Sequence, residues 1–327
     1  MFFRVLVSVL CVYLRLGALH PLQAQERGSA AESGGGPRIA PEKGYAVREI
    51  RGGLYWVSDG AYNTMFFVTS EGVVAIDAPP TLGAKYLKAI SEVTSQPVVY
   101  LIYSHEHTDH IGAANLFPKE VQIIAQRETA RILTERRDPR RPLPTIVFDD
   151  KYVLSLGGET LVLEYPGINH ERGNIFIFAP RQKTLMLVDV VFPGWMMWRR
   201  FALAQDIPGY FETVRSLDRK YDYKTLIGGH LNRVGTKEDV STQLAFMTDL
   251  HAAAANGLST TKMGEGMSAT DKTNAWAVFD NYIDRVTIHC VNAVTPRWKN
   301  RLAAFDVFIY DQCLSMEQSL RVDGPSM

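Results

Sequence analysis

The chain has 327 residues, of which 46% are hydrophobic and 21% are charged. This composition is ordinary for a soluble globular protein with one large domain or two small ones. The 35 basic and 35 acidic side chains cancel, so net charge gives no support for binding to nucleic acid or to an anionic membrane surface.

The first 24 residues have the pattern of a secretory signal peptide. Arg4 precedes an apolar run from Val5 to about Leu14, and Leu22-Gln23-Ala24 offers a cleavage site. The run is short for a membrane span, so we expect cleavage, export to the periplasm or the medium, and no stable membrane insertion. An uncleaved N-terminal anchor is the alternative. Residues 25–44 would then form a flexible leader, because Gly, Ser and Ala are frequent there.

Export would leave two cysteines, Cys290 and Cys313, in an oxidising compartment. Neither lies near the histidine-rich motif described below. They therefore form either a structural disulfide or a pair of buried thiols.

From residue 54 to residue 255 the sequence predicts runs of strands separated by helices. Strands are predicted at 54–58, 65–69, 72–77, 97–102, 121–125, 152–156, 160–165, 174–178, 184–188 and 225–227. Helices are predicted at 81–94, 111–117, 127–134, 210–219 and 237–255. Two groups of strands with helices between them indicate two sheets covered by helices. Residues 257–266 interrupt the pattern, and residues 270–322 predict a mostly helical extension.

Two connecting segments have more than one interpretation. Residues 135–144 are basic and contain proline, which fits a solvated connector better than a mobile loop over a site. Residues 192–198 carry two Trp and two Met, which would form an apolar pocket wall or a buried core loop. Arg199 and Arg200 follow, and either bind a carboxylate or phosphate or lie exposed to solvent.

The densest group of metal-binding side chains directly follows the predicted strand 97–102. Imidazole and carboxylate are ligands of a borderline metal such as zinc. A helix would scatter such side chains around its axis, whereas a loop leaving a strand can aim the first two one way and the last two another. The crowding suits a pair of ions better than one ion. The four residues are His105, His107, Asp109 and His110.

Three further candidate ligands share one position relative to the predicted strands. His170, Asp189 and His230 each lie just past a strand end. Side chains at such positions can converge on one edge of a sandwich of sheets. Each residue alone is a weak signal, but the recurrence supports one metal site built from separate strands.

The motif His105-x-His107-x-Asp109-His110, with the later His170, Asp189 and His230, resembles that of the metallo-β-lactamase superfamily. The resemblance covers about residues 45–250. It implies a four-layer αββα sandwich, with a hydrolase domain at 45–256 and a helical extension at 257–327. It also implies two Zn²⁺ ions per chain, with Fe or Mn as alternatives.

The same resemblance implies a role for each ligand. His105, His107 and His170 would bind the first ion, and Asp189 would bridge both ions. Asp109 would also act in catalysis by orienting a metal-bridging hydroxide or carrying its proton. The second ion would be held by Asp109, His110 and His230. Asp77, at the end of an early strand, would orient a ligand or cap a loop.

Asp189 also narrows the expected activity. True zinc β-lactamases have Cys or Ser at the matching position, whereas Asp resembles the lactonase, thioesterase and phosphodiesterase branches. We therefore expect an exported hydrolase of a small, partly apolar ester, with a lactone favoured and no nucleic-acid partner. A β-lactam hydrolase and a phosphodiesterase are alternative enzymes. A non-catalytic metal-binding protein is the alternative of another class, and a homodimer stays open.

Overall fold

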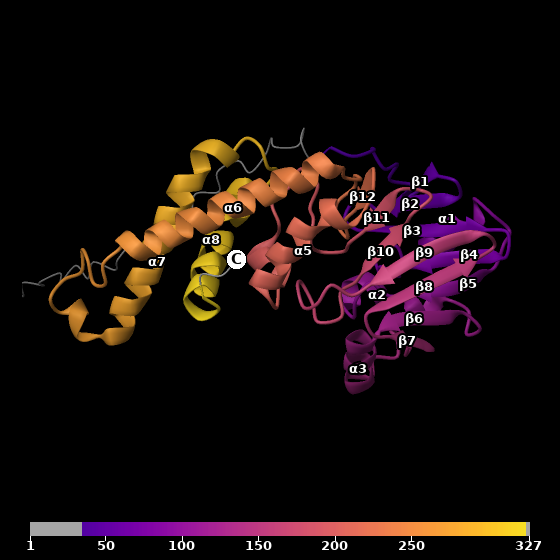
Figure 1. Cartoon of the computed structure of the whole chain (residues 1–327), viewed down its shortest axis with the longest axis horizontal. Helices are drawn as coiled ribbons and strands as arrows, with labels where there is room; N and C mark the ends of the chain where they lie inside the picture. Colours follow the sequence, from indigo (N-terminus) through magenta and orange to yellow (C-terminus); the bar gives the residue numbers. More distant parts are fainter. Residues whose placement is uncertain (1–34, 325–327) are drawn as a thin grey trace, which may run out of the picture.

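The computed structural model describes residues 35–324, which form two β-sheets and a set of helices (Figure 1). The predicted signal peptide and residues 25–34 of the predicted leader lie outside these residues. Within the described part of the chain, no helix is long and apolar enough to cross a membrane.

The first sheet has seven strands in sequence order. Neighbours from β1 to β4 are antiparallel, whereas β4 to β7 are parallel. Parallel strands place their carboxyl ends at one edge, so the loops after β4 and β5 lie side by side. The strands are β1 (Ala46–Arg51), β2 (Leu54–Ser58), β3 (Asn63–Thr69), β4 (Gly72–Ile76), β5 (Val98–Ile102), β6 (Gln122–Gln126) and β7 (Ile146–Phe148).

The second sheet has five strands in the order β12-β11-β10-β9-β8. Only β11 and β12 are parallel, so the loops that follow these two strands share one edge. The strands are β8 (Lys151–Leu156), β9 (Glu159–Glu164), β10 (Phe176–Ala179), β11 (Thr184–Met186) and β12 (Thr225–Ile227).

Three apolar clusters define four layers. Side chains of both sheets, such as Trp56 and Ile177, pack against each other and form the central cluster. A second cluster joins the outer face of the first sheet to α1 (Ala84–Ser91). The third joins the second sheet to α5 (Ile207–Lys220) and the C-terminal helices. The predicted αββα sandwich is therefore confirmed, together with its helical extension.

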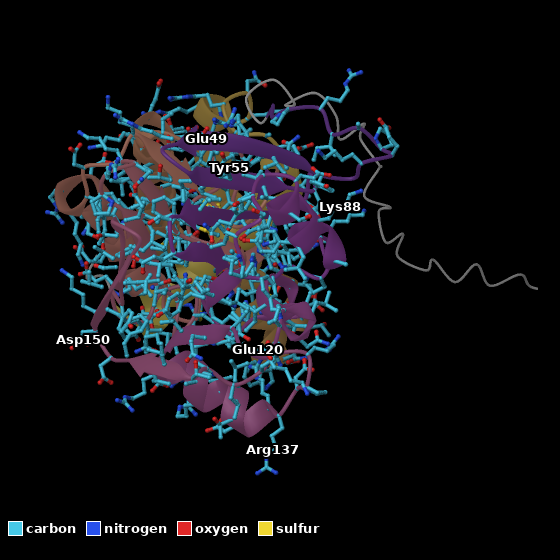
Figure 2. The ribbon with its side chains drawn as sticks, turned by 90° about the vertical axis from the view of Figure 1, so that its right-hand side faces the viewer. Glu49, Tyr55, Lys88, Glu120, Arg137 and Asp150 are labelled. Atoms are coloured by element: carbon cyan, nitrogen blue, oxygen red, sulfur yellow. A yellow bond between two sulfur atoms is a disulfide. The ribbon has the colours of Figure 1, made fainter. Side chains whose placement is uncertain are left out.

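Figure 2 views the molecule from the side of the first sheet. Charged side chains such as Lys88, Arg137 and Asp150 point outwards there, and all three are exposed. Arg137 directly follows α3 (Arg127–Arg136), in a left-handed conformation with a φ of 51° that ends the helix.

The C-terminal helices are α6 (Lys237–Thr260), α7 (Ala275–Trp298) and α8 (Phe305–Val322). The prediction that the helix beginning at Lys237 ends at residue 255 was wrong. α6 passes through Gly257, where a Cβ would lie 3.2 Å from atoms of Val286 on α7. Glycine here reflects the close approach of two helices, rather than a helix end.

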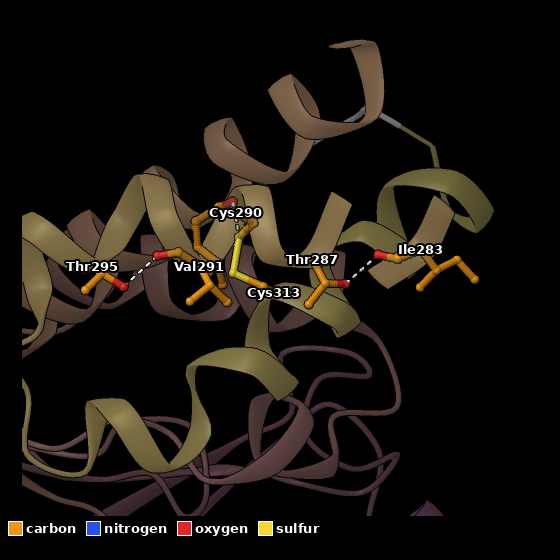
Figure 3. The surroundings of a disulfide bond; sticks show 7 residues. Ile283, Thr287, Cys290, Val291, Thr295 and Cys313 are labelled. Atoms are coloured by element: carbon orange, nitrogen blue, oxygen red, sulfur yellow. Dashed lines mark hydrogen bonds between the residues drawn. A yellow bond between two sulfur atoms is a disulfide. The ribbon is translucent and has the colours of Figure 1, made fainter. Parts of the chain in front are cut away.

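A disulfide bond between Cys290 of α7 and Cys313 of α8 links the last two helices (Figure 3). Both cysteines are fully buried. Of the two predicted alternatives, the structure contains the disulfide and not a pair of buried thiols.

Candidate metal centre

The histidine motif leaves the carboxyl end of β5 as a buried loop that Asp77 holds in place. Oδ1 of Asp77 accepts a hydrogen bond of 2.7 Å from the backbone N–H of Ser104. The Asp77 N–H donates to the carbonyl of Ile102 at the end of β5. Asp77 thus caps the loop, as one of its two predicted roles required. Burial raises the pKa of its carboxyl group to about 7.

The second half of the motif forms the short helix α2 (Thr108–Ile111), for which His107 is the N-cap residue. The loop carries His105 and His107 to one group of ligands, and α2 carries Asp109 and His110 to another. The helix predicted at 111–117 is replaced by α2 and a 3₁₀ turn at Ala114–Leu116.

The structure brings all seven predicted ligands together in two clusters. In each cluster the candidate ligand atoms lie within 4.8 Å of one another. Asp189 belongs to the first cluster, and its carboxylate also contacts His110 and His230 of the second. The first cluster is His105, His107, His170 and Asp189, and the second is Asp109, His110 and His230.

Asp189 lies at the centre of the site. Its Oδ2 is 3.1 Å from His110 Nε2 and 3.3 Å from His170 Nε2, and its Oδ1 is 3.1 Å from His230 Nε2. The Asp189 carboxylate therefore faces imidazoles of both clusters, which is the arrangement of a bridging ligand. Asp189 has a φ of 60°, a conformation that costs energy for a residue with a side chain and is typical of functional sites.

Two observations test whether this site fits a metal pair. Nε2 of His105, His110 and His230 and Oδ1 of Asp189 are buried and make no well-aligned hydrogen bond in the described structure. This holds although the Asp189 carboxylate lies 3.1 to 3.9 Å from these three ring nitrogens. A Cβ on Gly229 would lie 2.7 Å from that Asp189 oxygen, so glycine keeps this space open. Buried polar atoms without partners are costly, and a bound cation would satisfy them. The two clusters therefore fit a dinuclear metal site.

The electrostatics of the protein alone agree with this fit. Burial lowers the pKa of His170 to about 4, so its imidazole is neutral and has a lone pair available near pH 7. Burial would raise the pKa of Asp189, but His110 and His230 hold it well below the usual range. Burial opposes charge on His110 as well, yet the Asp189 carboxylate raises its pKa to about 9 in the metal-free protein.

A buried pair of glutamates behind His107 was missed in the sequence analysis. His107 Nδ1 lies 3.2 Å from His170 Nε2, so Nδ1 is the nitrogen that faces the site. Its Nε2 faces away, 3.7 Å from Glu171 Oε1 and 4.0 Å from Glu106 Oε1. Burial, and then the charge of Glu171, raise the pKa of Glu106 to about 7. Glu106 lies inside the motif, and its full burial at a position between two ligands could not be predicted from residue type.

The connector at residues 135–144 is not simply solvated. Arg141 is buried and donates a hydrogen bond to the backbone carbonyl of Glu106. Arg136, at the end of α3, lies 3.6 Å from the Glu106 carboxylate. Arg136 and Arg141 therefore contact the loop that carries the histidine motif, and no residue of 135–144 lines the cavity described next.

An open, mainly apolar cavity of about 340 Å³ lies beside the second cluster. Asp109 and His230 form its polar end, and Trp195 and Trp198 form part of its wall, as one interpretation of segment 192–198 predicted. Arg199 does not line it, because its guanidinium pairs with Asp311 of α8. The complete lining is Tyr62, Asp109, Phe192, Trp195, Met196, Trp198, His230, Leu231, Ala304 and Phe308.

Tyr62 is a further residue of the site that the sequence analysis missed. Its ring packs against that of His230, with centroids 4.6 Å apart and planes tilted by 48°, and its hydroxyl donates a hydrogen bond of 3.3 Å to Asp109 Oδ2. Burial and the nearby Asp109 raise the pKa of Tyr62 to about 12, so the phenol keeps its proton at neutral pH. Its place just before β3 gave no sequence signal of proximity to the histidines.

The fold and the two ligand clusters together define a class of protein. The family model of the metallo-β-lactamase superfamily matches residues 57–230, more than half of the chain, and the chain belongs to this superfamily. The ligand clusters and the relatives described next make it a hydrolase of that superfamily with a site suited to two metal ions.

Two curated relatives are enzymes with different activities. The chain is 28% identical over 220 residues to the 2,4-dinitroanisole O-demethylase subunit alpha of Nocardioides sp. (strain JS1661), covering 61% of this chain and 67% of that protein. It is 23% identical over 176 residues to the metallo-beta-lactamase type 2 of Elizabethkingia meningoseptica, covering 52% and 69%.

Solved structures show the same fold. A metallo-beta-lactamase from Pontibacter korlensis aligns with a TM-score of 0.54 and 21% identity, over 62% of this chain and 97% of that one. A double mutant of the sec-alkyl sulfatase PisA1 aligns with a TM-score of 0.55 and 18% identity, over 70% of this chain and 45% of that one. At these identities the likeness concerns the fold alone.

Proposed function

We propose that the protein is an exported hydrolase with two zinc ions per chain that cleaves a small, partly apolar ester, with a lactone favoured. The observation that carries this proposal is a pair of adjoining His and Asp clusters, the second of which lines a mainly apolar cavity. Imidazole and carboxylate ligands suit zinc. The paired cysteines and the signal-like N-terminal sequence support export, because disulfides persist in oxidising compartments.

His105, His107 and His170 would hold one ion, Asp109, His110 and His230 the other, and Asp189 both. When bound, such a metal pair supplies an activated water at neutral pH and polarises the carbonyl group that is attacked.

The protein groups nearest the cavity would position the substrate and the attacking water. The Asp109 side chain is 45% exposed, more than the other ligands, and can accept a hydrogen bond from a water molecule in the cavity. Tyr62 donates its hydroxyl proton to Asp109 Oδ2 and would orient this carboxylate toward the cavity. Asp189 supports ester cleavage over β-lactam cleavage, by resemblance to the branches that carry Asp at this position.

A second candidate is hydrolysis of an activated aryl ether to a phenol and an alcohol. The relative named as a 2,4-dinitroanisole O-demethylase supports it, since the name describes an uncharged aromatic ether as substrate. The aromatic lining of the cavity here, with Tyr62, Trp195 and Phe308, suits such a ring.

Proton release at constant pH by the zinc-loaded protein tests these candidates, with an alkyl-substituted γ-lactone compared with a cephalosporin. Nitrophenolate absorbance tests 2,4-dinitroanisole in parallel. We expect the lactone to be hydrolysed fastest and the His107→Ala variant to be inactive. Faster cephalosporin turnover would contradict the argument from Asp189. No turnover of any of the three substrates would refute the proposed activity.

A further inference from the structure

The helical extension contributes to the cavity beside the metal centre. Ala304 and Phe308, at the start of α8, line it together with Tyr62 and His230. These two residues lie outside the matched residues 57–230. This wall of the cavity is therefore a feature of this chain's own extension.

Several contacts fix α8 against the loop that forms the rest of the wall. Gln312 of α8 donates hydrogen bonds to the carbonyls of Met197 and Trp198, at 2.6 and 2.8 Å. Its Oε1 accepts a hydrogen bond of 2.8 Å from the N–H of Phe201. The disulfide at Cys313 then ties the same turn of α8 to α7. Phe308, one helical turn earlier, is thereby held at a fixed position in the cavity.

The charges around the cavity disfavour the binding of an anionic group among its aromatic side chains. Among the described lining residues there is no Lys or Arg, and the one carboxylate is the ligand Asp109. The nearby Arg233 pairs with Asp239 and donates to the carbonyl of Pro193. A substrate anion placed among these aromatic side chains would lose its water without gaining a partner, which is costly. Positive charge from bound metal ions would lie only at the end formed by Asp109 and His230.

We propose that the cavity between Tyr62 and Phe308 binds an uncharged apolar group of the substrate, and that α8 determines which group fits. The inference rests on the proposed function, since it identifies the substrate class of that site. An apolar cavity of about 150 Å³ accommodates benzene. A cavity of about 340 Å³ leaves room for a substituted aromatic ring or a short alkyl chain. Phe308 is then a specificity-determining residue.

A binding experiment tests the inference without relying on turnover. Nitrobenzene is titrated into the metal-loaded protein, and quenching of tryptophan fluorescence reports its approach to Trp195 and Trp198. All variants carry Trp276→Phe, because the Trp276 indole is 79% exposed and would be quenched by collision. We expect saturable quenching that becomes about tenfold weaker in Phe308→Ala, since an aromatic contact and its buried area are lost.

The matched control is Tyr310→Ala, which truncates another aromatic side chain of α8. Tyr310 hydrogen-bonds Asp284 and does not line the cavity. Nitrobenzene affinity should stay within about twofold of the parent value, and Phe308→Leu should restore most of the affinity lost in Phe308→Ala. Equal losses in the Phe308→Ala and Tyr310→Ala variants, or no loss in either, would overturn the role of Phe308.

A matched pair of esters tests the charge argument. 4-Nitrophenyl pentanoate and mono-4-nitrophenyl glutarate differ only in whether the chain ends in a methyl group or a carboxylate. We expect kcat/KM to be at least about tenfold higher for the neutral ester, because the carboxylate would have to be desolvated in the apolar cavity. Comparable kcat/KM values would overturn the inference. No turnover of either ester, with quenching that still depends on Phe308, would refute the proposed activity while supporting the binding site.

Discussion

The disulfide between Cys290 and Cys313 should determine how firmly α8 is held against the cavity. The two cysteines are 23 positions apart, and closing a loop of that length lowers the entropy of the unfolded segment. The loop-entropy relation gives a stabilisation of about 3 kcal/mol at 25 °C. We therefore expect the double variant Cys290→Ala, Cys313→Ala to lower the free energy of opening of α7 and α8 by about that amount.

Native-state hydrogen exchange measures this opening directly. A loss of about 3 kcal/mol corresponds to amide exchange on the order of 100-fold faster. The faster exchange should be confined to amides of α7 and α8, while amides of β4 and β5 in the first sheet serve as an internal reference. Metal content should be unchanged, because none of the seven candidate ligands lies on these helices. Exchange in α8 within threefold of the parent protein would refute the reasoning and show that packing alone fixes the helix.

Four further predictions concern the metal centre. His107→Ala should lower the zinc content measured by mass spectrometry and abolish hydrolysis; full zinc with full rate would contradict its assignment. Asp189→Asn should reduce metal stoichiometry by loss of a shared charge, and an unchanged stoichiometry would exclude bridging. Glu171→Gln should weaken metal binding roughly 10- to 100-fold in a chelator competition, because its carboxylate lies 3.7 Å from the outward nitrogen of His107; an unchanged affinity would refute this positioning role. The pKa of His110 is raised from 6.5 to about 9 in the metal-free fold, so its contribution to stability is complete below pH 6.5 and is lost as pH rises through 9. Urea unfolding of the metal-free protein against pH should show this loss, and His110→Gln should remove it; parallel curves for both proteins would contradict the assignment.

The candidate ligands could be identified because four of them form a dense motif after β5, the other three recur after strands, and the whole order resembles that of the superfamily. The position after a parallel strand fixes the sheet edge at which a side chain lies, as for His230 after β12. Residues whose importance depends on contacts across the fold gave no such signal. Glu171 lies near His107, and Phe308 lines the same cavity as Tyr62, only because loops and helices distant in sequence pack together.

The elements missed in the sequence were short or half-exposed. β1 (Ala46–Arg51) carries three charged residues and is largely exposed, so its alternation of apolar residues is weak. β7 has only three residues and follows the proline-containing connector. The extension of α6 beyond residue 255 depended on the packing of Gly257 against α7, a tertiary effect that overrides the usual preference of glycine for helix ends.

The separate origin of the cavity wall has a consequence for how this scaffold could diversify. The metal ligands come from loops of the two sheets and from α2, whereas Phe308 comes from a helix with its own covalent anchor. Substitutions on α8 can therefore reshape the cavity without replacing a metal ligand, because none of the seven candidate ligands lies on this helix. A library randomised at position 308 should thus yield altered selectivity, whereas Ala304 has a left-handed backbone conformation with a φ of 56° that limits which residues it accepts.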